Sequence, residues 1–378
     1  MLAKSLITAP QGPLIVLIAA YYPPALGGVE KVIETTAFNL ALSGKVVTVL
    51  TSGKNIWTQV TSAPFLTIKR IPVFEFFNIP FAPTLIWHLL KLPKNSLIHY
   101  HLVQAYWPER VFLLCKIRRI PYIAHFHLDI EPSGILGVLF KLYKRVIWGM
   151  FLRHAHEVIV CSETQVPILT KKYKVKADRI TVIYNAVSDD FFTDIARKPI
   201  GDTVRLLYVG RLAEQKKIER LINMMSFIKI PCELNIVGDG ECRKSLQQLV
   251  TRLNLKNVQF LGSKNSSEIQ EQFRLHDVLL IASDKEGLPL IVLEAMAAGL
   301  PIIGSRVIGI TDLVADTGIL VEAPYSENFA AAVQSLVVNP QLLQRLSQQS
   351  IQKARLYSWN QYNTKLAEVY KKVERFYR

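Results

Sequence analysis

The stretch that decides the fold reads Ser283-Asp-Lys-Glu-Gly-Leu-Pro-Leu-Ile-Val-Leu-Glu-Ala-Met-Ala-Ala-Gly-Leu-Pro301. An apolar run at residues 277–282 comes just before it and predicts a buried β-strand. Pro289 favours the first position of a helix, and residues 290–298 are good helix formers that a Gly-Leu-Pro sequence closes. The stretch therefore predicts a strand, an acidic glycine-containing loop and a short helix.

Two glutamates, Glu286 and Glu294, carry the chemistry of this stretch. The N–H groups at the start of the predicted helix favour an anion, and Glu286 lies in the loop at that helix start. Glu294 lies within the helix, where its carboxylate can accept hydrogen bonds from sugar hydroxyls. The pattern predicts a phosphate compound flanked by polyols; the alternative is a solvated pair of glutamates on a surface loop.

Length and composition indicate two folded domains. The chain has 378 residues, of which half are apolar, so two cores can be buried. Of the formal net charge of +15, most lies in residues 1–185, which hold 21 Lys and Arg against 9 Asp and Glu. A basic first half indicates an acidic partner, either nucleic acid or an anionic membrane surface. The sequence contains no run of 18 or more apolar residues, so no transmembrane helix is predicted.

The first apolar run, residues 14–20, predicts a buried parallel strand rather than a signal peptide, because it is short and leads directly into a loop. The chain has four cysteines without the spacing of a metal or disulfide framework. They are therefore expected to be reduced core residues of a cytoplasmic protein.

Strand-like and helix-like segments alternate along the whole chain, which is typical of doubly wound α/β domains with parallel sheets. The expected strands are residues 14–20, 46–51, 97–101, 122–127, 158–162, 204–209, 233–237, 258–261, 278–282 and 301–304. Two sets of about five strands predict two Rossmann-like domains, with a break near residues 188–203. Ligands of such sheets bind at the carboxyl ends of the strands, so the cleft between two facing sheets is the expected site.

Two cations follow the first expected strand of the second half. Arg211 and Lys216 lie on the loop that leaves residues 204–209. Fixed cations there would neutralise a diphosphate, and an arginine can bind its oxygens in a bidentate manner. The alternative is a solvated basic loop.

Glycines also follow strands. Gly27-Gly28 comes after the first strand and precedes a helix, and Gly238 follows residues 233–237. Glycine lets backbone N–H groups approach a phosphate, a sugar or a base closely, although a plain turn explains the same pattern.

The histidines indicate no metal or catalytic site in the sequence. His125 ends a strand and is expected to be a core or capping residue. His99 and His101 share one face of another strand, but no acidic or cysteine cluster accompanies them in the sequence, so a metal site is not predicted. No Asp-x-Asp pair for a divalent ion and no Ser-His-Asp arrangement is evident.

A long apolar helix is expected at residues 135–153. Lys141, Lys144 and Arg145 share one face, with Arg153 near it. Such a helix either lies on an anionic membrane surface or is a core helix with a solvated basic edge. Aromatic residues interleaved for base stacking are not evident, so nucleic acid is not the expected partner.

Taken together, these motifs resemble the retaining GT-B glycosyltransferases of family 4, the large Glu-x7-Glu family that includes phosphatidylinositol mannosyltransferase and sucrose synthase. The resemblance spans nearly the whole chain and rests on Gly27-Gly28, His127, residues 182–185, Gly210-Arg211 with Lys216, Gly238 to Gly240, the Glu286/Glu294 motif and Trp359. It implies two Rossmann-like domains that face each other across a cleft.

The resemblance also implies roles for individual residues. Arg211 and Lys216 would bind the donor diphosphate and stabilise the departing nucleotide. Glu286 would contact the donor sugar, Glu294 the ribose hydroxyls, and His127 the donor sugar near its reacting carbon. The remaining donor-binding positions would be Gly28, Gly238, Gly287, Leu288, Pro289 and Leu290.

The expected domains are residues 1–187 for the acceptor, completed by a crossover helix at about 356–378, and residues 203–355 for the nucleotide sugar. The expected reaction transfers a hexose or N-acetylhexosamine from a UDP- or GDP-sugar to a glycan or lipid acceptor, without metal or cofactor. The enzyme would be cytoplasmic, with peripheral attachment to the inner membrane face an open question. Alternatives are a nucleotide-sugar epimerase on the same fold and a non-enzymatic polyanion-binding protein.

Two positions depart from the family pattern. Ala186 stands where the family usually has glycine after the asparagine, and Lys217 stands where glycine often follows the lysine. Both are loop positions, so the departures bear on loop shape.

Overall fold

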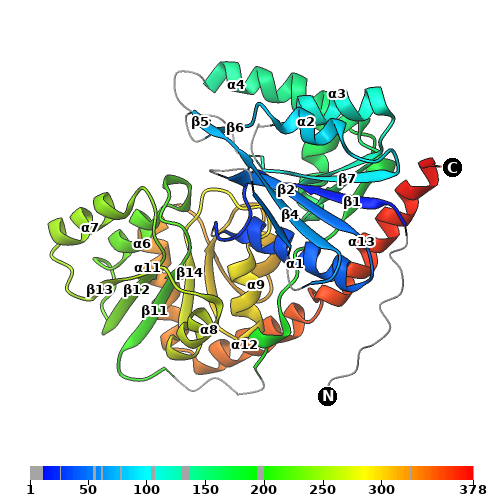
Figure 1. Cartoon of the computed structure of the whole chain (residues 1–378). Helices are drawn as coiled ribbons and strands as arrows, with labels where there is room; N and C mark the ends of the chain where they lie inside the picture. Colours follow the sequence, from blue (N-terminus) through cyan, green and yellow to red (C-terminus); the bar gives the residue numbers. More distant parts are fainter. Residues whose placement is uncertain are drawn as a thin grey trace. The chain divides into compact units, whose positions relative to one another are not determined.

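The computed structural model describes residues 12–25, 27–53, 57–60, 63–76, 79–103, 107–129, 137–193, 200–323 and 325–377. The chain divides into two compact units (Figure 1). Unit 1 comprises residues 1–184 and 363–378, and unit 2 comprises residues 185–362. Each unit is a doubly wound α/β structure, as the alternation of strand-like and helix-like segments predicts.

Unit 1 is built on an eight-stranded sheet in the order β10-β9-β8-β7-β1-β2-β4-β3. Its strands are β1 (Leu14–Ile18), β2 (Val47–Gly53), β3 (Trp57–Val60), β4 (Leu66–Pro72), β7 (Ser96–Leu102), β8 (Tyr122–Phe126), β9 (Glu157–Val160) and β10 (Ile180–Val182). All neighbouring strands are parallel except β3, which runs antiparallel to β4. The short strands β5 (Phe74–Phe76) and β6 (Ile79–Phe81) form a separate antiparallel pair.

Helices wrap this sheet, as Figure 1 shows for α1 to α4 and α13. They are α1 (Gly28–Leu42), α2 (Leu85–Leu90), α3 (Pro108–Arg118), α4 (Gly137–Tyr143), α5 (Gly149–His154) and α13 (Trp359–Glu374). Shorter helical turns are η1 (Lys144–Trp148), η2 (Glu163–Gln165), η3 (Ile168–Lys172), η4 (Ala177–Arg179) and η7 (Arg375–Tyr377). The core of the unit joins the inner strands to large aromatic residues such as Trp107, Trp148 and Phe151.

The expected helix at residues 135–153 exists within the described residues as α4, a π-helical turn η1 and α5. Its basic face is different from the one expected. Lys141, Arg145 and Arg153 are exposed, but Lys144 is buried and donates to Asp129 Oδ1 over 2.9 Å, with its ammonium 4.3 Å from the ring centroid of Trp148. The expectation that Lys144 belongs to a solvated basic edge is therefore wrong, because a buried carboxylate pairs with it.

Unit 2 holds a six-stranded parallel sheet in the order β13-β12-β11-β14-β15-β16. The strands are β11 (Val204–Val209), β12 (Cys232–Val237), β13 (Val258–Gly262), β14 (Val278–Ile281), β15 (Ile302–Ser305) and β16 (Gly318–Val321). Its helices are α6 (Ile218–Met224), α7 (Arg243–Arg252), α8 (Ser266–Leu275), α9 (Leu290–Ala297), α10 (Ile310–Val314), α11 (Tyr325–Val337) and α12 (Pro340–Ala354), with short turns η5 (Asp189–Phe191) and η6 (Glu214–Lys216). The strand order is the one of Rossmann folds, and β11 and β14 are the two neighbours at which the direction of winding reverses.

The division between the units lies close to the expected domain limits and differs in detail. It falls after Tyr184 and, near the end of the chain, after Tyr362. The second division lies inside α13, so this helix begins with residues of unit 2 and continues with residues of unit 1. Most of α13 therefore completes unit 1, although about 180 residues of unit 2 separate it from the rest of that unit.

The structure also bears on the expectations about cysteines and transmembrane helices. The four cysteines form no disulfide, and Cys115, Cys161 and Cys232 are buried. In the described part of the chain, the helices are all too short or too polar to cross a membrane.

Candidate active site

The predicted donor-binding residues of unit 2 gather at the carboxyl ends of β11 and β14. These strands are direct neighbours, with Leu206 paired to Val278 and Leu207 to Leu279. Arg211 and Lys216 lie on the loop and turn that follow β11, and Glu286 lies on the loop that follows β14. Because ligands of such sheets bind where the winding reverses, this edge is the natural ligand site of the unit.

An ion pair joins the two loops. Lys216 Nζ donates to Glu286 Oε1 over 2.6 Å, and the Ser283 hydroxyl donates to the same oxygen over 2.6 Å. The Glu286 residue is only 7% exposed, whereas the Lys216 side chain is 24% exposed. A carboxylate that is nearly buried and a cation that reaches solvent are thus held side by side at the ends of two neighbouring strands.

Backbone contacts hold the two loops in register. The Asp284 N–H donates to the Gln215 carbonyl over 3.0 Å, and Gln215 Nε2 donates to the Lys285 carbonyl over 2.6 Å. From α6, Arg220 Nη1 donates to the Ala282 carbonyl over 2.9 Å, and Arg220 Nη2 lies 2.6 Å from Asp284 Oδ1. The position of Lys216 beside Glu286 therefore follows from hydrogen bonds on either side of the pair.

Arg211 stands apart from this network. Its side chain is exposed, and its carbonyl accepts a hydrogen bond from the Tyr208 hydroxyl over 3.1 Å. The backbone is therefore anchored while the guanidinium is accessible to a ligand.

Glycines bring neighbouring loops into contact. Gly238 has a φ of +133°, and a Cβ atom there would lie 1.9 Å from the Gly210 carbonyl oxygen. Gly309 has a φ of +84°, and a Cβ atom there would lie 2.4 Å from the Gly287 carbonyl oxygen. Only glycine fits either position, so close packing between backbones is a sufficient reason for both residues.

The start of α9 lies at the same strand edge. Asn185 Nδ2 donates to the Leu288 carbonyl over 2.7 Å and fixes the loop before the helix. The expectation that Pro289 occupies the first helical position is off by one residue, because Pro289 is the N-cap, with φ −70° and ψ 121°, and Leu290 begins the helix. Glu294 lies one turn further along α9 and is partly exposed.

Lys217 shows how the chain tolerates its departure from the family pattern. Its φ of 51° and ψ of 41° are left-handed, which is the conformation that glycine adopts most easily. Its ammonium lies 3.8 Å from carboxylate oxygens of Glu214, Glu219 and Asp284. Ala186 is different, since positive φ among described non-glycine residues occurs at Phe65, Arg119, Lys174, Lys217 and Asn254. The loop shape at Ala186 therefore needs no glycine.

Two predicted site residues belong to unit 1. Gly28 is exposed and begins α1, whose N-cap is Gly27. His127 follows β8 and is 3% exposed. Its Nε2 atom lies 2.9 Å from His101 Nδ1, and its Nδ1 atom lies 3.6 Å from Cys161 Sγ. Both ring nitrogens thus face protein atoms, so the ring would have to turn to reach a sugar.

Ser283, Arg220 and Gly309 take part in the site, but the sequence analysis assigned them no role. Ser283 was within the decisive stretch, three residues before Glu286, and this spacing could have indicated its hydrogen bond. Arg220 and Gly309 act on loops that are distant in sequence, and no local pattern signals such contacts.

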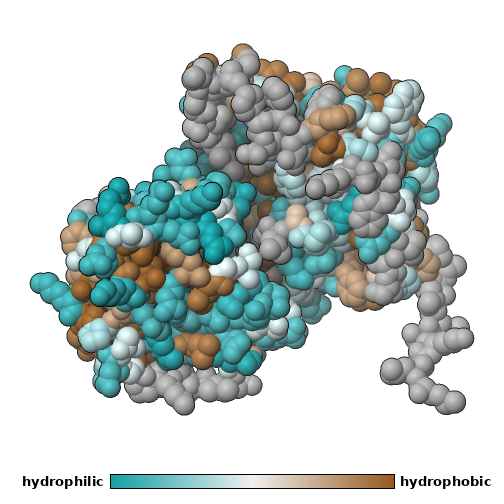
Figure 2. Space-filling view, turned by 60° about the vertical axis from the view of Figure 1, so that its left-hand side comes forward, coloured by the Kyte–Doolittle hydropathy of each residue, from teal (hydrophilic) through white to brown (hydrophobic). Residues whose placement is uncertain are grey.

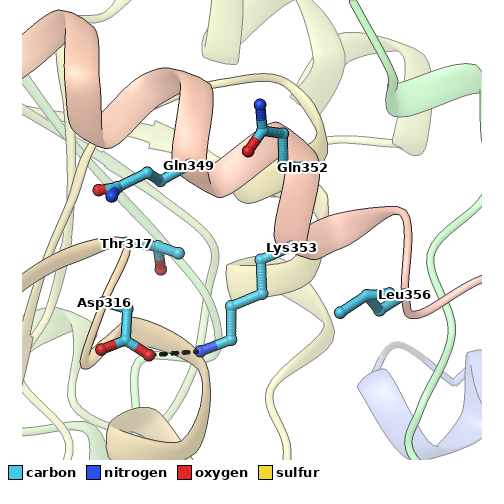
Figure 3. A pocket seen from close by; sticks show the side chains of 6 residues that line it. All are labelled: Asp316, Thr317, Gln349, Gln352, Lys353 and Leu356. Atoms are coloured by element: carbon cyan, nitrogen blue, oxygen red, sulfur yellow. Dashed lines mark ion pairs between the residues drawn. The ribbon is translucent and has the colours of Figure 1, made fainter.

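A surface pocket of unit 2 is lined by Asp316, Thr317, Gln349, Gln352, Lys353 and Leu356 (Figure 3). Lys353 Nζ lies 3.8 Å from Asp316 Oδ2 and donates to the Asp312 carbonyl over 3.1 Å. This lysine is engaged with its own unit, and the pocket includes none of the predicted site residues.

Solved structures identify the class of fold. Sucrose-phosphate synthase from Thermosynechococcus elongatus matches with a TM-score of 0.78 and 22% identity, covering 95% of this chain and 98% of the other. The Anabaena HepE protein in complex with UDP-glucose matches with a TM-score of 0.74 and 18% identity, covering 95% and 99%. The fold is therefore GT-B, as predicted.

The sequence comparisons are more specific. Residues 26–191 match the model of Glycosyltransferase Family 4, and residues 190–353 match that of Glycosyl transferases group 1. The amylovoran biosynthesis glycosyltransferase AmsD of Erwinia amylovora is 30% identical over 257 residues, which cover 66% of this chain and 70% of AmsD. The chain belongs to the GT-B glycosyltransferases, with a family 4 first half and a group 1 second half.

Proposed function

We propose that this chain is a retaining, metal-independent glycosyltransferase that moves a hexose or N-acetylhexosamine from a UDP- or GDP-sugar to a hydroxyl of a glycan or lipid acceptor. The observation that carries the proposal is the Lys216–Glu286 pair at the switch point of unit 2. The structure of HepE in complex with UDP-glucose supports a nucleotide-sugar donor. The similarity to AmsD, a glycosyltransferase of amylovoran biosynthesis, supports a task in polysaccharide synthesis.

The donor diphosphate would be bound by Arg211, Lys216 and the start of α9. One of the three Lys216 donors is used by Glu286, and the others can reach phosphate oxygens. The exposed Arg211 adds a second cation, and the first N–H groups of α9 add partial positive charge. These groups would stabilise the negative charge that grows on the diphosphate as it departs.

The sugar and ribose would be bound by the two glutamates. The hydrogen bonds from Lys216 and Ser283 both end on Glu286 Oε1, so Oε2 is the oxygen that would accept from a donor-sugar hydroxyl. Glu294, one helical turn into α9, would accept from the ribose hydroxyls. His127 was also expected to contact the sugar, but its two ring nitrogens face His101 and Cys161, so the proposed transfer does not use its side chain.

The proposed reaction breaks the bond between the anomeric carbon and the diphosphate oxygen and forms a bond from that carbon to the acceptor oxygen. The acceptor proton passes to an oxygen of the leaving phosphate. Attack from the face that the diphosphate leaves retains the anomeric configuration. No side chain is assigned as a covalent nucleophile, since Glu286 already accepts from Lys216 and Ser283.

An anionic membrane is the proposed surface on which a lipid acceptor is met. Unit 1 exposes Trp87 and Leu90 on α2, Leu113 and Ile117 on α3, and Leu142 on α4. Helices α2 and α3 pack against each other, and Figure 2 shows apolar surface at the top, where α2, α3 and α4 lie in Figure 1. Exposed basic residues accompany this surface: Lys91, Lys116, Arg119, Lys141 and Arg145. Apolar side chains beside basic ones suit the boundary between headgroups and acyl chains.

The transfer proposal is tested with Lys216→Ala and Glu286→Ala, assayed for sugar transfer from UDP- and GDP-sugars in the presence of EDTA. We expect each variant to lose at least about 100-fold in kcat/KM, because a fixed charge at the diphosphate or sugar is removed. Lys264→Ala, from an ion pair to Glu268 on α8, is the matched control and should keep full activity. Full activity in both site variants would contradict the assignment.

The same assay separates the alternatives. An epimerase converts the donor without an acceptor, whereas a transferase needs one. A non-enzymatic polyanion-binding protein would bind no nucleotide sugar and would show steep salt dependence.

Membrane binding is tested separately with vesicles that contain anionic lipid. Wild-type protein should co-sediment at low salt, and the variant Lys141→Glu/Arg145→Glu should bind at least about 30-fold less, since each of the two basic residues near such a surface adds about 1 kcal/mol. Equal binding to neutral and anionic vesicles would contradict an electrostatic attachment.

A further inference from the structure

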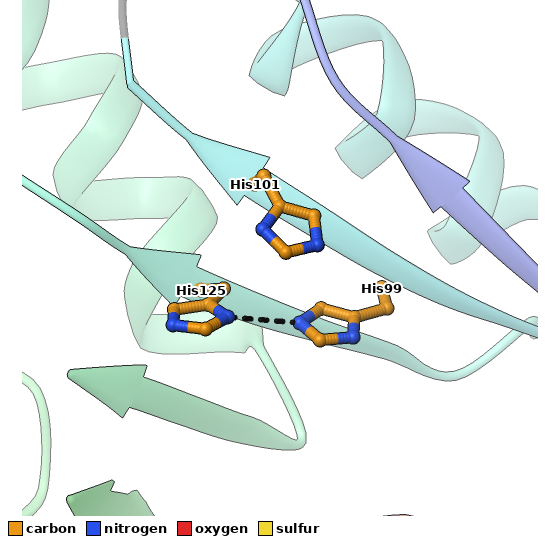
Figure 4. Close-up of side chains that lie close together, drawn as sticks. All are labelled: His99, His101 and His125. Atoms are coloured by element: carbon orange, nitrogen blue, oxygen red, sulfur yellow. Dashed lines mark hydrogen bonds between the residues drawn. The ribbon is translucent and has the colours of Figure 1, made fainter. Parts of the chain in front are cut away.

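Four histidines and one cysteine lie together inside unit 1. Figure 4 shows that His99 and His101 from β7 and His125 from β8 project from the same side of two neighbouring strands. His127 continues that side after β8, and Cys161 follows β9, the next strand of the sheet. All five residues are buried. Because side chains alternate along strands, residues two apart share a face, and three adjacent strands bring the five together.

The innermost atoms of this cluster are a sulfur and two ring nitrogens. Cys161 Sγ lies 3.7 Å from His125 Nε2 and 3.6 Å from His127 Nδ1. The three atoms lie within 4.8 Å of one another. In a tetrahedral zinc site, with Zn–S about 2.3 Å and Zn–N about 2.0–2.1 Å, sulfur and nitrogen lie about 3.6 Å apart. The two observed separations, 3.6 and 3.7 Å, are compatible with this value as well as with hydrogen bonds to sulfur.

The outer nitrogens of the same two rings are already bound. His125 Nδ1 lies 3.3 Å from His99 Nε2, and His99 Nδ1 lies 2.7 Å from the Tyr370 hydroxyl. His127 Nε2 lies 2.9 Å from His101 Nδ1. Metal-binding histidines regularly hydrogen-bond through the nitrogen that does not bind the ion, and such a bond fixes the tautomer and the orientation of the ring.

The tautomers of the two rings decide how the inner nitrogens can bind. When the ring protons are on the outer nitrogens of His125 and His127, both inner nitrogens present lone pairs toward Cys161 Sγ. In that tautomer, an ion bound to the thiolate would be coordinated by both nitrogens at once.

We propose that His125 Nε2, His127 Nδ1 and Cys161 Sγ form a buried binding site for one thiophilic metal ion, Zn²⁺ or Cu⁺, with His99 and His101 orienting the two ligand histidines. Thiolate and imidazole are the ligands that both ions prefer. Binding releases the cysteine proton to solvent and leaves three neutral or anionic ligands on the cation. No oxidation or reduction is involved.

A bound ion would cross-link the ends of strands β8 and β9 and, through His99, connect them to β7. His125 and His127 come from the end of β8, Cys161 follows β9, and His99 links the ligands to β7 and to Tyr370 on α13. The sequence analysis set aside His99 and His101 because no cysteine accompanies them in the sequence. That reason does not hold in three dimensions, since Cys161 is brought to their neighbours by the fold.

The test is metal uptake by the full chain. Protein purified without chelator, or dialysed metal-free and then given Zn²⁺ or Cu⁺, should hold one ion per chain by mass spectrometry. The Co²⁺ form should show a thiolate-to-metal charge-transfer band in the near ultraviolet. Cys161→Ser should lose the band and the tightly held ion. Cys115→Ser, at another buried cysteine of the same unit, should keep both.

Two further variants distinguish the loss of a metal ligand from a failure to fold. His125→Asn removes one ligand, and His99→Leu removes only the hydrogen bond to its outer nitrogen, so His99→Leu should weaken binding by about 10–100-fold. Circular dichroism checks that each variant is folded. In wild-type protein and in Cys115→Ser, the ion should raise Tm and protect Cys161 from alkylation in mild denaturant, whereas in Cys161→Ser it should leave Tm unchanged.

The proposal is overturned if metal-free wild-type protein takes up neither ion, or if Cys161→Ser binds as tightly as wild type. Either result would leave the cluster as a hydrogen-bonded group of neutral side chains. These measurements read metal content and spectra rather than sugar transfer, so they are independent of the proposed activity.

Discussion

The two units share a doubly wound parallel sheet and place their polar groups differently. Unit 1 buries charged or titratable side chains in or beside its sheet: Arg70, His99, His101, His125, His127, Asp129, Lys144 and Glu157. In unit 2, Glu286 and His276 are the only buried side chains of the types Asp, Glu, Lys, Arg and His among the described residues. The charged pair of its candidate site, Lys216 and Glu286, lies on a turn and a loop that follow strands, and hydrogen bonds to the backbone hold these segments together. The same architecture therefore builds polar sites in two ways, through strand faces or through loops.

The two units also differ in the interactions that stabilise them. A buried charge or imidazole costs free energy unless a partner satisfies it, so unit 1 depends on pairs such as Lys144–Asp129 and Lys372–Glu157, at 2.9 and 2.6 Å. Unit 2 depends instead on close backbone packing between its loops, which needs glycine at Gly238 and Gly309.

The largest effect is expected from Gly238→Ala, which attacks the backbone packing of unit 2. The new Cβ atom would meet the Gly210 carbonyl oxygen at 1.9 Å, and the residue has a φ of +133°. We expect the free energy of unfolding to fall by about 3 kcal/mol or more. Denaturant unfolding measures it. Gly262→Ala is the control, because its φ of +71° is also left-handed but no atom lies within 4 Å, so only about 1 kcal/mol should be lost there.

The second largest effect is expected at the ion pair between Lys216 and Glu286. Lys216→Met should lower kcat by about 10²–10³-fold, because it removes a fixed cation at the diphosphate. Glu286→Gln tests the other partner, and the double variant should lose much less than the product of the single losses, since the two side chains share one hydrogen bond of 2.6 Å. Steady-state kinetics of the wild type, the two single variants and the double variant gives the coupling energy between the two side chains. Fully independent effects would show that the pair does not act as a unit.

The third prediction concerns pH and separates the two units. In metal-free protein, burial lowers the pKa of His99 and His127 from 6.5 to about 3, and also lowers the pKa of His101 and His125. The unfolded chain then binds protons that the folded chain does not, so stability that is complete above pH 6.5 is lost as the pH falls. At pH 5 the loss is about 2 kcal/mol for His99 and for His127, whose pKa in the folded chain is about 3.

Hydrogen exchange measured peptide by peptide checks this prediction. Protection of β7 and β8 should fall between pH 7 and pH 5 more than protection of β11 and β14, whose unit has the single lowered histidine His276. Equal losses in both sheets would remove the distinction between the units.

The smallest effect is a local one that should be the same in both units. Lys217 has φ 51° and ψ 41° in unit 2, and Arg119 has φ 54° and ψ 37° at the end of α3 in unit 1. Replacing either by glycine should raise stability by about 0.5–1 kcal/mol, because glycine adopts this conformation without steric cost. The exposed ion pairs of Lys217 contribute little in comparison. Thermal unfolding of both variants measures the gain, and a loss at Lys217→Gly alone would give those ion pairs more weight.

The sequence predicted unit 2 better than unit 1, for a physical reason. In unit 2, Arg211, Lys216 and Glu286 each follow a strand closely, so parallel pairing of those strands is enough to bring them together. In unit 1, the partners of Lys144 and His127 come from other strands and helices, and no local spacing indicates them. Strands β3, β4 and β10 of the large sheet of unit 1 were also missed, and so was the edge strand β16 of unit 2. Three of them are only three or four residues long, and β4 contains Lys69, Arg70 and Pro72, which interrupt its apolar pattern.

The ion pair Lys216–Glu286 was not predicted as a pair, although both residues were. The sequence placed one cation and one carboxylate at neighbouring strand ends, but their contact depends on the turn at residues 214–216 and on Gln215, which binds the Lys285 carbonyl. Loop conformations of this kind arise from contacts between segments about 70 residues apart.

The passage of α13 from unit 2 into unit 1 bears on how the chain is made. Tyr370 contacts His99, Lys372 pairs with Glu157, and Glu374 lies 3.7 Å from Lys45. During synthesis, the sheet of unit 1 leaves the ribosome first but lacks these partners until residues 363–377 emerge. Unit 2, residues 185–362, is translated before that segment. The sheet of unit 1 is thus made first but gains these partners only after unit 2 has been synthesised, and the contact of His99 with Tyr370 in the histidine cluster forms no earlier than that step.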